Sequence, residues 1–108
     1  MPCTGGVQPT TGTGPNNQDI IMPIKFHYVY ILRSLKDGLF YIGYTENLKN
    51  RVYEHNMGKN VSTKNRRPLE LIFYEAYPNK LDALRREAYF KTTKGKTTLK
   101  QMLKEFLK

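Results

Sequence analysis

The sequence predicts an α+β domain, in which a small three-stranded, mostly antiparallel sheet is flanked by three helices. Residues 26–32 and 39–44 are dense in aromatic and β-branched side chains, and the Asp37-Gly38 pair between them is typical of a tight hairpin turn. An alternating run over residues 69–77 predicts a third strand. With the helical segments between and after these runs, the element order is β-β-α-β-α-α.

Three segments have helical patterns with recognisable ends. Thr45 and Asn79 can act as N-caps, Gly58 can end the first helix, and Gly95 is expected to interrupt the chain before a final helix that Thr97 opens. The expected helices span residues 46–57, 80–93 and 97–108.

Residues 1–24 differ in composition from the rest of the chain. They are rich in Gly, Pro, Thr, Gln and Asn and poor in apolar side chains. Such a segment cannot bury enough surface to offset its ordering entropy, so we expect a disordered N-terminal tail followed by one domain over residues 25–108.

Charge is concentrated in the predicted domain. Residues 23–108 carry all 18 Lys and Arg of the chain but only eight of its nine acids, a net charge of +10. A basic domain of this size favours a polyanionic partner, either nucleic acid or an anionic membrane surface, although a solubility role explains the charge as well.

Several classes of protein are excluded by composition. The single cysteine of the 108 residues excludes an internal disulfide framework and a multi-cysteine zinc site. No apolar run has the length of a membrane span, and the N-terminus has no secretory signal. We therefore expect a soluble, cytoplasmic protein.

The predicted hairpin sorts its side chains onto two faces. If Lys36 faces Leu39 across the turn, even positions of the first strand share a face with odd positions of the second. Gly43 would then allow close approach to the backbone, and the tyrosine-rich face resembles the floor of a partly wet groove, although tyrosine is also a common strand residue. The apolar face holds Val29, Ile31, Phe40 and Ile42, and the other face holds Tyr28, Tyr30, Leu32, Tyr41 and Gly43.

The first helix brings two basic side chains together. Leu48 and Val52 mark its buried stripe, and Arg51 and His55 are four residues apart beside that stripe. Arg51 could grip a phosphate with two hydrogen bonds, and its charge would make His55 less basic. A solvated basic rim explains the same pair.

The second helix places an acid beside its expected buried face of Leu81, Leu84 and Ala88. A carboxylate among apolar groups is costly unless it meets a cation. For Glu87 that cation could be an arginine or a hard divalent ion such as Mg²⁺, and the residues alone leave both open.

The surplus positive charge falls into two patches, either of which could be a solvated surface. Hydroxyl groups of Ser62 and Thr63 lie in the first patch and suit phosphate oxygens. No base-reading motif accompanies the charge, so recognition would be led by the nucleic-acid backbone and would depend on salt. The candidate nucleic-acid-binding residues are Lys59, Lys64, Arg66 and Arg67 in the loop, and Lys91, Lys94 and Lys96 near the C-terminus.

These residues, in this order, resemble the GIY-YIG nuclease superfamily over about residues 26–103. Tyr28-Val29-Tyr30 is similar to the first motif, and Tyr41-Ile42-Gly43 matches the second. The chain is most similar to the small stand-alone members related to the N-terminal domain of the excision-repair nuclease subunit. It departs from the pattern at Tyr28, where Gly is common, and lacks a clear counterpart of a C-terminal Asn. The matched helix residues are Arg51, His55 and Glu87.

The resemblance implies a metal-dependent endonuclease that hydrolyses phosphodiester bonds in structured, branched or damaged DNA during repair or recombination. Glu87 would hold one Mg²⁺ or Mn²⁺ ion, and Arg51 would neutralise the phosphate. Tyr30 or Tyr41 would activate water, as a phenolate whose pKa nearby positive charge lowers. His55 would position a phenol or relay a proton.

Two other functions fit the same residues. A non-catalytic nucleic-acid binding module on this fold would bind in a salt-dependent way and form no product. A small basic domain could instead act through a protein partner, docked on the apolar edge of the last helix. For the nuclease, DNA rather than RNA is the expected substrate, with a protein partner for specificity and no membrane association.

Overall fold

The computed structural model describes residues 24–108, so the expected disordered tail lies outside the described residues except for Ile24. The strands are β1 (His27–Ser34), β2 (Phe40–Thr45) and β3 (Leu69–Tyr77). The helices are α1 (Leu48–Asn56), α2 (Lys80–Phe90) and α3 (Thr93–Met102), with a short 3-10 turn, η3 (Lys64–Arg66), before β3. This is the predicted α+β fold with the predicted β-β-α-β-α-α order.

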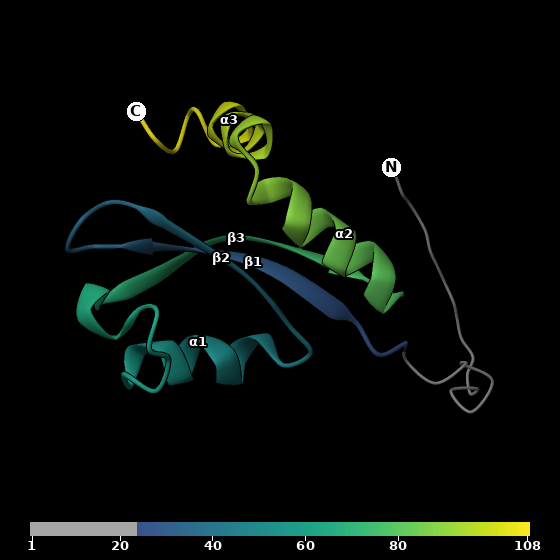
Figure 1. Cartoon of the computed structure of the whole chain (residues 1–108), viewed down its shortest axis with the longest axis horizontal. Coiled ribbons are helices and arrows are strands. Elements are labelled where there is room, and N and C mark those ends of the chain that lie inside the picture. The colour runs from purple at the N-terminus through teal and green to yellow at the C-terminus, as the bar shows by residue number, and fades with distance from the viewer. Residues whose placement is uncertain (1–23) are drawn as a thin grey trace, which may run out of the picture.

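The sheet is antiparallel, with strand order β2-β1-β3. Helix α1 covers one face, and α2 and α3 cover the other (Figure 1). Each face has its own core, because alternate residues of the central strand point to opposite sides. Tyr30 and Leu32 of β1 pack toward α1, whereas Val29 and Ile31 pack toward α2 and α3. No helix within residues 24–108 combines the length and the apolarity that a bilayer crossing requires.

The hairpin register differs from the expected one by two residues. Ser34 and Leu39 form the last backbone pair, with 3.0 Å between the Ser34 N and Leu39 O atoms, so Lys36 does not face Leu39. The turn is wider because the Ser34 side chain accepts hydrogen bonds from the backbone of Lys36 and Asp37. A shift of two keeps the parity of side chains, so the predicted division of the hairpin into two faces is confirmed.

Two of the expected helix caps need correction. Asn47 rather than Thr45 caps α1, because its side chain accepts a hydrogen bond from the Asn50 N–H at 3.1 Å, and Thr45 instead bonds Asn47. Helix α3 begins at Thr93, four residues before the expected start, with Thr92 as its cap.

Gly95 does not interrupt the chain but lies buried inside α3. A Cβ atom at this position would overlap the backbone carbonyl of Tyr89, so the glycine lets α3 fold back tightly on the end of α2. Asn79 caps α2 as predicted, but this helix ends at Phe90 rather than at residue 93.

The residues that α2 buries also differ from the expected ones. Leu81 is 69% exposed and Ala88 is exposed, whereas Ala83 and Phe90 are fully buried against the sheet. The apolar pattern predicted the wrong stripe: Ala83 and Phe90 are the residues of α2 that join the apolar core with β1 and α3. Glu87 is four residues from Ala83 and three from Phe90, so it lies on the face that α2 turns to the sheet.

Candidate active site

Tyr30 is the centre of the candidate site. Its side chain is fully buried under α1, and its hydroxyl lies 2.9 Å from Nε2 of His55. The expected partly wet groove is therefore wrong at this position: the tyrosine-rich face is a second core, and Leu32 beside Tyr30 is also fully buried. His55 is fully buried too, although it was expected beside the buried stripe of its helix rather than in it.

Gly43 makes room for the Tyr30 ring. It pairs with Tyr30 across the hairpin, and a Cβ atom at Gly43 would lie 2.5 Å from Cζ of Tyr30. Carbon atoms do not approach this closely, so any other residue would displace the ring. The group that approaches the Gly43 backbone closely is thus the ring of Tyr30, the tyrosine of the first motif.

His55 is held on both ring nitrogens. Nε2 faces Tyr30, and Nδ1 lies 2.7 Å from Oγ1 of Thr63, which is itself fully buried. Thr63 had been expected to offer its hydroxyl to phosphate oxygens; its burial corrects that expectation. No spacing pattern in the sequence predicts this bond, because the path of the loop between His55 and Thr63 determines the contact.

Burial controls the protonation of both partners. It raises the pKa of Tyr30 to about 12; the negative charge of ionised Tyr41 and of Glu87 adds to the rise, and Arg51 opposes it. Burial, followed by the positive charge of Arg51, lowers the pKa of His55. The expected lower basicity of His55 is confirmed, but the expectation of a lowered phenol pKa is wrong for Tyr30. At neutral pH the pair is a neutral phenol bonded to a neutral imidazole.

Tyr41 and Arg51 form the more accessible side of the site. The Tyr41 ring meets the His55 ring edge-on, with centroids 4.9 Å apart, and is half-buried. The Arg51 side chain is 39% exposed, and its Nε lies 3.3 Å from Oε1 of Glu54, one turn further along α1. Because the Arg51 side chain is partly exposed, its guanidinium can meet a ligand that arrives from solvent.

Glu87 belongs to α2, in the helix layer on the other face of the sheet from Tyr30 (Figure 1). Its charge contributes to the raised pKa of Tyr30, so the carboxylate lies within electrostatic range of the phenol. Its side chain is 19% exposed, and Oε2 lies 3.1 Å from Nζ of Lys91 in the same helix. The alternative arginine partner is absent among the described residues: neighbouring Arg86 pairs with Glu75 at 2.9 Å.

The donor set around Glu87 fits a hard divalent ion held by few protein ligands. Within residues 24–108 no three His, Cys, Asp or Glu side chains cluster as a closed metal site would require. Mg²⁺ is commonly bound by one or two carboxylates, with water and substrate phosphate completing its shell. A partly exposed carboxylate whose ion-pair partner is a half-exposed lysine meets this requirement.

The candidate nucleic-acid-binding residues divide between the two faces. Arg66 is engaged within the protein, because its guanidinium donates to Oδ2 of Asp37 and to the carbonyl of Leu39, each at 3.0 Å. Arg67 donates to the carbonyl of Lys64, and Lys91 pairs with Glu87. The remaining candidates, Lys59, Lys64, Lys94 and Lys96, are exposed.

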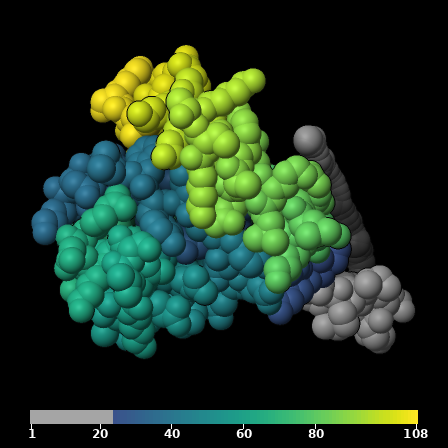
Figure 2. Space-filling model, in the orientation of Figure 1, coloured from purple at the N-terminus to yellow at the C-terminus, as the bar shows by residue number. Residues whose placement is uncertain are grey.

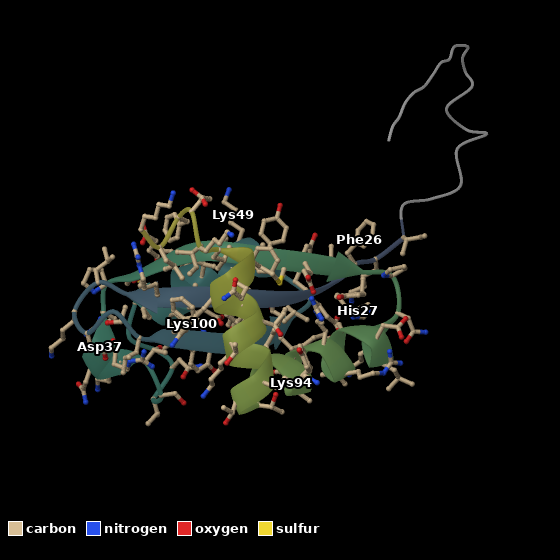
Figure 3. All side chains as sticks on the ribbon, turned by 90° about the horizontal axis from the view of Figure 1, so that it is seen from above. Phe26, His27, Asp37, Lys49, Lys94 and Lys100 are labelled. Carbon is tan, nitrogen blue, oxygen red and sulfur yellow. The ribbon has the colours of Figure 1, made fainter. Side chains whose placement is uncertain are left out.

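The two groups of cations are well separated. The loop group lies on the α1 side of the sheet, near Asp37 at one end of the hairpin, whereas Lys94 and Lys100 extend from α3 on the opposite side (Figures 1 and 3). The structure thus brings together Tyr30, Tyr41, Gly43, Arg51 and His55, with Glu87 near them, but does not gather the lysines into one patch.

Comparisons of this chain with family models and with known proteins agree on one family. Residues 26–101 match the model of the GIY-YIG catalytic domain. A UPF0213 protein of Staphylococcus haemolyticus is 43% identical over 77 residues, covering 70% of this chain and 93% of the relative. The UPF0213 protein YazA of Bacillus subtilis is 47% identical over 71 residues, covering 65% and 71%.

A solved structure is also similar. The solution NMR structure of a UPF0213 protein from Bacillus halodurans is 38% identical, covers 71% of this chain and 84% of that one, and has a TM-score of 0.46. The family match spans most of the chain and includes both tyrosine motifs and both helices of the site. The chain therefore belongs to the GIY-YIG nuclease family and resembles its small UPF0213 members.

Proposed function

We propose that this protein is a metal-dependent endonuclease that hydrolyses phosphodiester bonds in DNA, with structured, branched or damaged DNA as its substrate in repair or recombination. The observation that carries the proposal is the Tyr30–His55 hydrogen bond, which is buried beside Tyr41 and Arg51 and lies within electrostatic range of Glu87. A module that only binds a polyanion needs positive charge; it does not need a neutral phenol and imidazole fixed beside a carboxylate.

The two tyrosines take different roles in this mechanism. Tyr30 keeps its proton at neutral pH, because its pKa is about 12, so it orients groups through its hydroxyl and does not act as a base. Tyr41 is less buried and faces His55, so it is the candidate that contacts and activates the attacking water. His55 acts as a positioning residue that holds the Tyr30 hydroxyl.

Charge on the phosphate is handled from two directions. The Arg51 guanidinium stabilises the negative charge that builds on the non-bridging oxygens as the water oxygen bonds to phosphorus and the leaving oxygen departs. Glu87 would hold one Mg²⁺ or Mn²⁺ ion, which when bound supplies positive charge for the phosphate and the leaving oxygen. Exposed lysines, Lys59 and Lys64 on one side and Lys94 and Lys96 on the other, would contact backbone phosphates of the flanking DNA.

Substitution Glu87→Gln tests the function most directly. It keeps the shape of the side chain but removes the charge that would hold the ion, so we expect cleavage of flap, junction and nicked duplexes with Mg²⁺ or Mn²⁺ to fall by roughly 100-fold or more. Glu105→Gln is the matched control, because Glu105 forms an exposed ion pair with Lys108 away from the site.

The outcomes separate the competing functions. Cleavage by Glu87→Gln at the wild-type rate would refute the role of Glu87. Steeply salt-dependent binding by the wild-type protein, without metal-dependent product on any substrate, would instead identify a non-catalytic binding module.

A further inference from the structure

The tip of the β1–β2 hairpin, residues 35–39, carries two leucines that are mostly exposed. Leu35 is 57% exposed and Leu39 is 64% exposed. Figure 2 shows this tip protruding at the left edge of the molecule, beside the loop that contains η3. A single exposed leucine is unremarkable, but two on one protruding turn form an apolar contact point.

The tip is held firmly in spite of its exposed position. The Ser34 hydroxyl donates to the carbonyl of Arg66 at 2.6 Å and accepts from the backbone of Lys36 and Asp37, both at 3.1 Å. The Arg66 guanidinium pairs with Asp37 at 3.0 Å, and Nζ of Lys36 donates to the carbonyl of Asn65 at 3.1 Å. These bonds join the tip to η3, so the two leucines are presented on a rigid support.

Positive charge lies directly beside the leucines. A hollow of about 630 Å³ is bounded by three basic side chains and has no acidic residue in its lining. Its shape and charge suit the phosphates of a nucleic-acid backbone, whereas an apolar protein partner would leave these cations without a counter-charge. The lining residues are Lys36, Asn56, Lys64, Asn65, Arg67 and Pro68.

The same short turn connects the hairpin tip with the candidate active site. Thr63, at the N-terminal end of η3, bonds the ring of His55, and Arg66, at its other end, bonds Asp37 in the tip. Along β2, Leu39 precedes Gly43 by four residues, or ~13 Å of extended chain, which equals about four base-pair steps of duplex. The tip is thus fixed at a short, constant distance from the Tyr30 ring.

We propose that the two leucines of the hairpin tip contact the terminal base pair of a DNA duplex where it meets a branch or a flap, while the adjacent basic hollow binds the backbone of that duplex. Apolar side chains serve as such wedges in proteins that unstack or kink DNA. The contact rests on the proposed nuclease function and specifies its substrate: a duplex whose end meets a branch or a flap close to the active site. A continuous duplex offers no end face for the leucines.

The test compares binding to a flap substrate with binding to a continuous duplex of the same length. Fluorescence anisotropy without divalent ions keeps the DNA intact and makes the measurement independent of cleavage. The variant is Leu35→Ser/Leu39→Ser, and the control is Leu81→Ser, which changes a leucine of similar exposure on the opposite side of the sheet. A fluorescent base analogue in the terminal base pair of the flap reports the contact in the wild-type protein.

We expect the double variant to lose the preference for the flap by about tenfold, while Leu81→Ser keeps it. The wild-type protein should change the fluorescence of the base analogue, and the double variant should not. Three outcomes would overturn the proposal. The double variant could keep the flap preference of the wild type, the wild type could show no flap preference, or the double variant could lose affinity equally for both DNAs. If cleavage is never observed but these binding results hold, the nuclease function fails and the docking surface stands.

Discussion

The two faces of the sheet are built on different principles, although both use the same central strand. Toward α2 and α3, β1 presents Val29 and Ile31, which pack with Phe90 in an apolar core. Toward α1 it presents Tyr30, whose hydroxyl enters a buried chain of hydrogen bonds with His55 and Thr63. The tyrosine and imidazole of the site lie on the α1 face, whereas the other face supplies the apolar packing that keeps the strand in place and, on α2, the carboxylate of Glu87.

The two faces respond differently to substitution, because an apolar core and a buried hydrogen-bonded chain lose stability in different ways. An apolar core loses stability gradually as methyl groups are removed. A buried polar chain is more demanding, because one missing partner leaves a donor or acceptor without water or protein to satisfy it. We therefore expect substitutions in the buried hydrogen-bonded chain of the α1 face to affect activity and stability together, and substitutions in the apolar core of the other face to affect stability alone.

The strongest test of the contrast between the two faces compares Gly43→Val with Ile42→Val, because the two residues are adjacent but face opposite sides of the sheet. The valine at Gly43 overlaps the Tyr30 ring, so we expect nuclease activity to fall by about 100-fold through misplaced groups, with a loss of roughly 1–3 kcal/mol in the free energy of unfolding. Ile42→Val should cost about 0.5–1.5 kcal/mol and leave activity unchanged. Cleavage rates measure the effect on activity, and urea unfolding measures the effect on stability. Normal activity of Gly43→Val would contradict the role of the Tyr30 ring in the site.

A second test compares Thr63→Val with Thr98→Val, which remove threonine hydrogen bonds on opposite faces of the sheet. Thr63 is fully buried against His55, whereas Thr98, half-buried, lies 2.6 Å from the Tyr89 hydroxyl near solvent. We expect Thr63→Val to cost about 1–3 kcal/mol and to reduce activity, because one ring nitrogen of His55 loses its partner. Thr98→Val should cost about 1 kcal/mol or less, with full activity. Equal effects of the two substitutions on activity would remove the distinction between the faces.

The pH dependence of stability gives the smallest expected effect. Since burial lowers the pKa of His55 below that of the unfolded chain, the unfolded state gains a proton first as the pH falls. Stability is thus fully present above about pH 6.5 and declines as the pH falls toward the folded pKa, by at most about 1.4 kcal/mol per pH unit. His55→Gln should abolish this part of the slope between pH 8 and 5 in chemical unfolding, and an unchanged slope would show that the pKa of His55 is the same in the folded and the unfolded protein.

The sequence predicted what depends on local pattern. The Asp37-Gly38 pair, the alternation of β3 and the Asn79 cap identified their elements, and the bounds of β3 are those of the structure. The two faces of the hairpin were also predicted, because parity of side chains does not change when a register shifts by two.

What the sequence could not predict depends on contacts between distant segments. The burial of His55, its bond to Thr63 and the docking of α2 through Ala83 and Phe90 follow from how each helix settles on the sheet. Gly95 was expected to break a helix because its tight contact with Tyr89 is invisible in a linear pattern. The pKa of Tyr30 rises rather than falls for the same reason: burial outweighs the nearby cation.

The 3-10 turn between α1 and β3 constrains how the protein can vary. Within four residues it bonds the imidazole at one end and the acid of the hairpin turn at the other. An insertion or deletion there cannot be absorbed as in an ordinary surface loop, since it would misalign the two attachments at once. Grafting or tagging this protein is therefore safer at the segment after α3 than at this short connection.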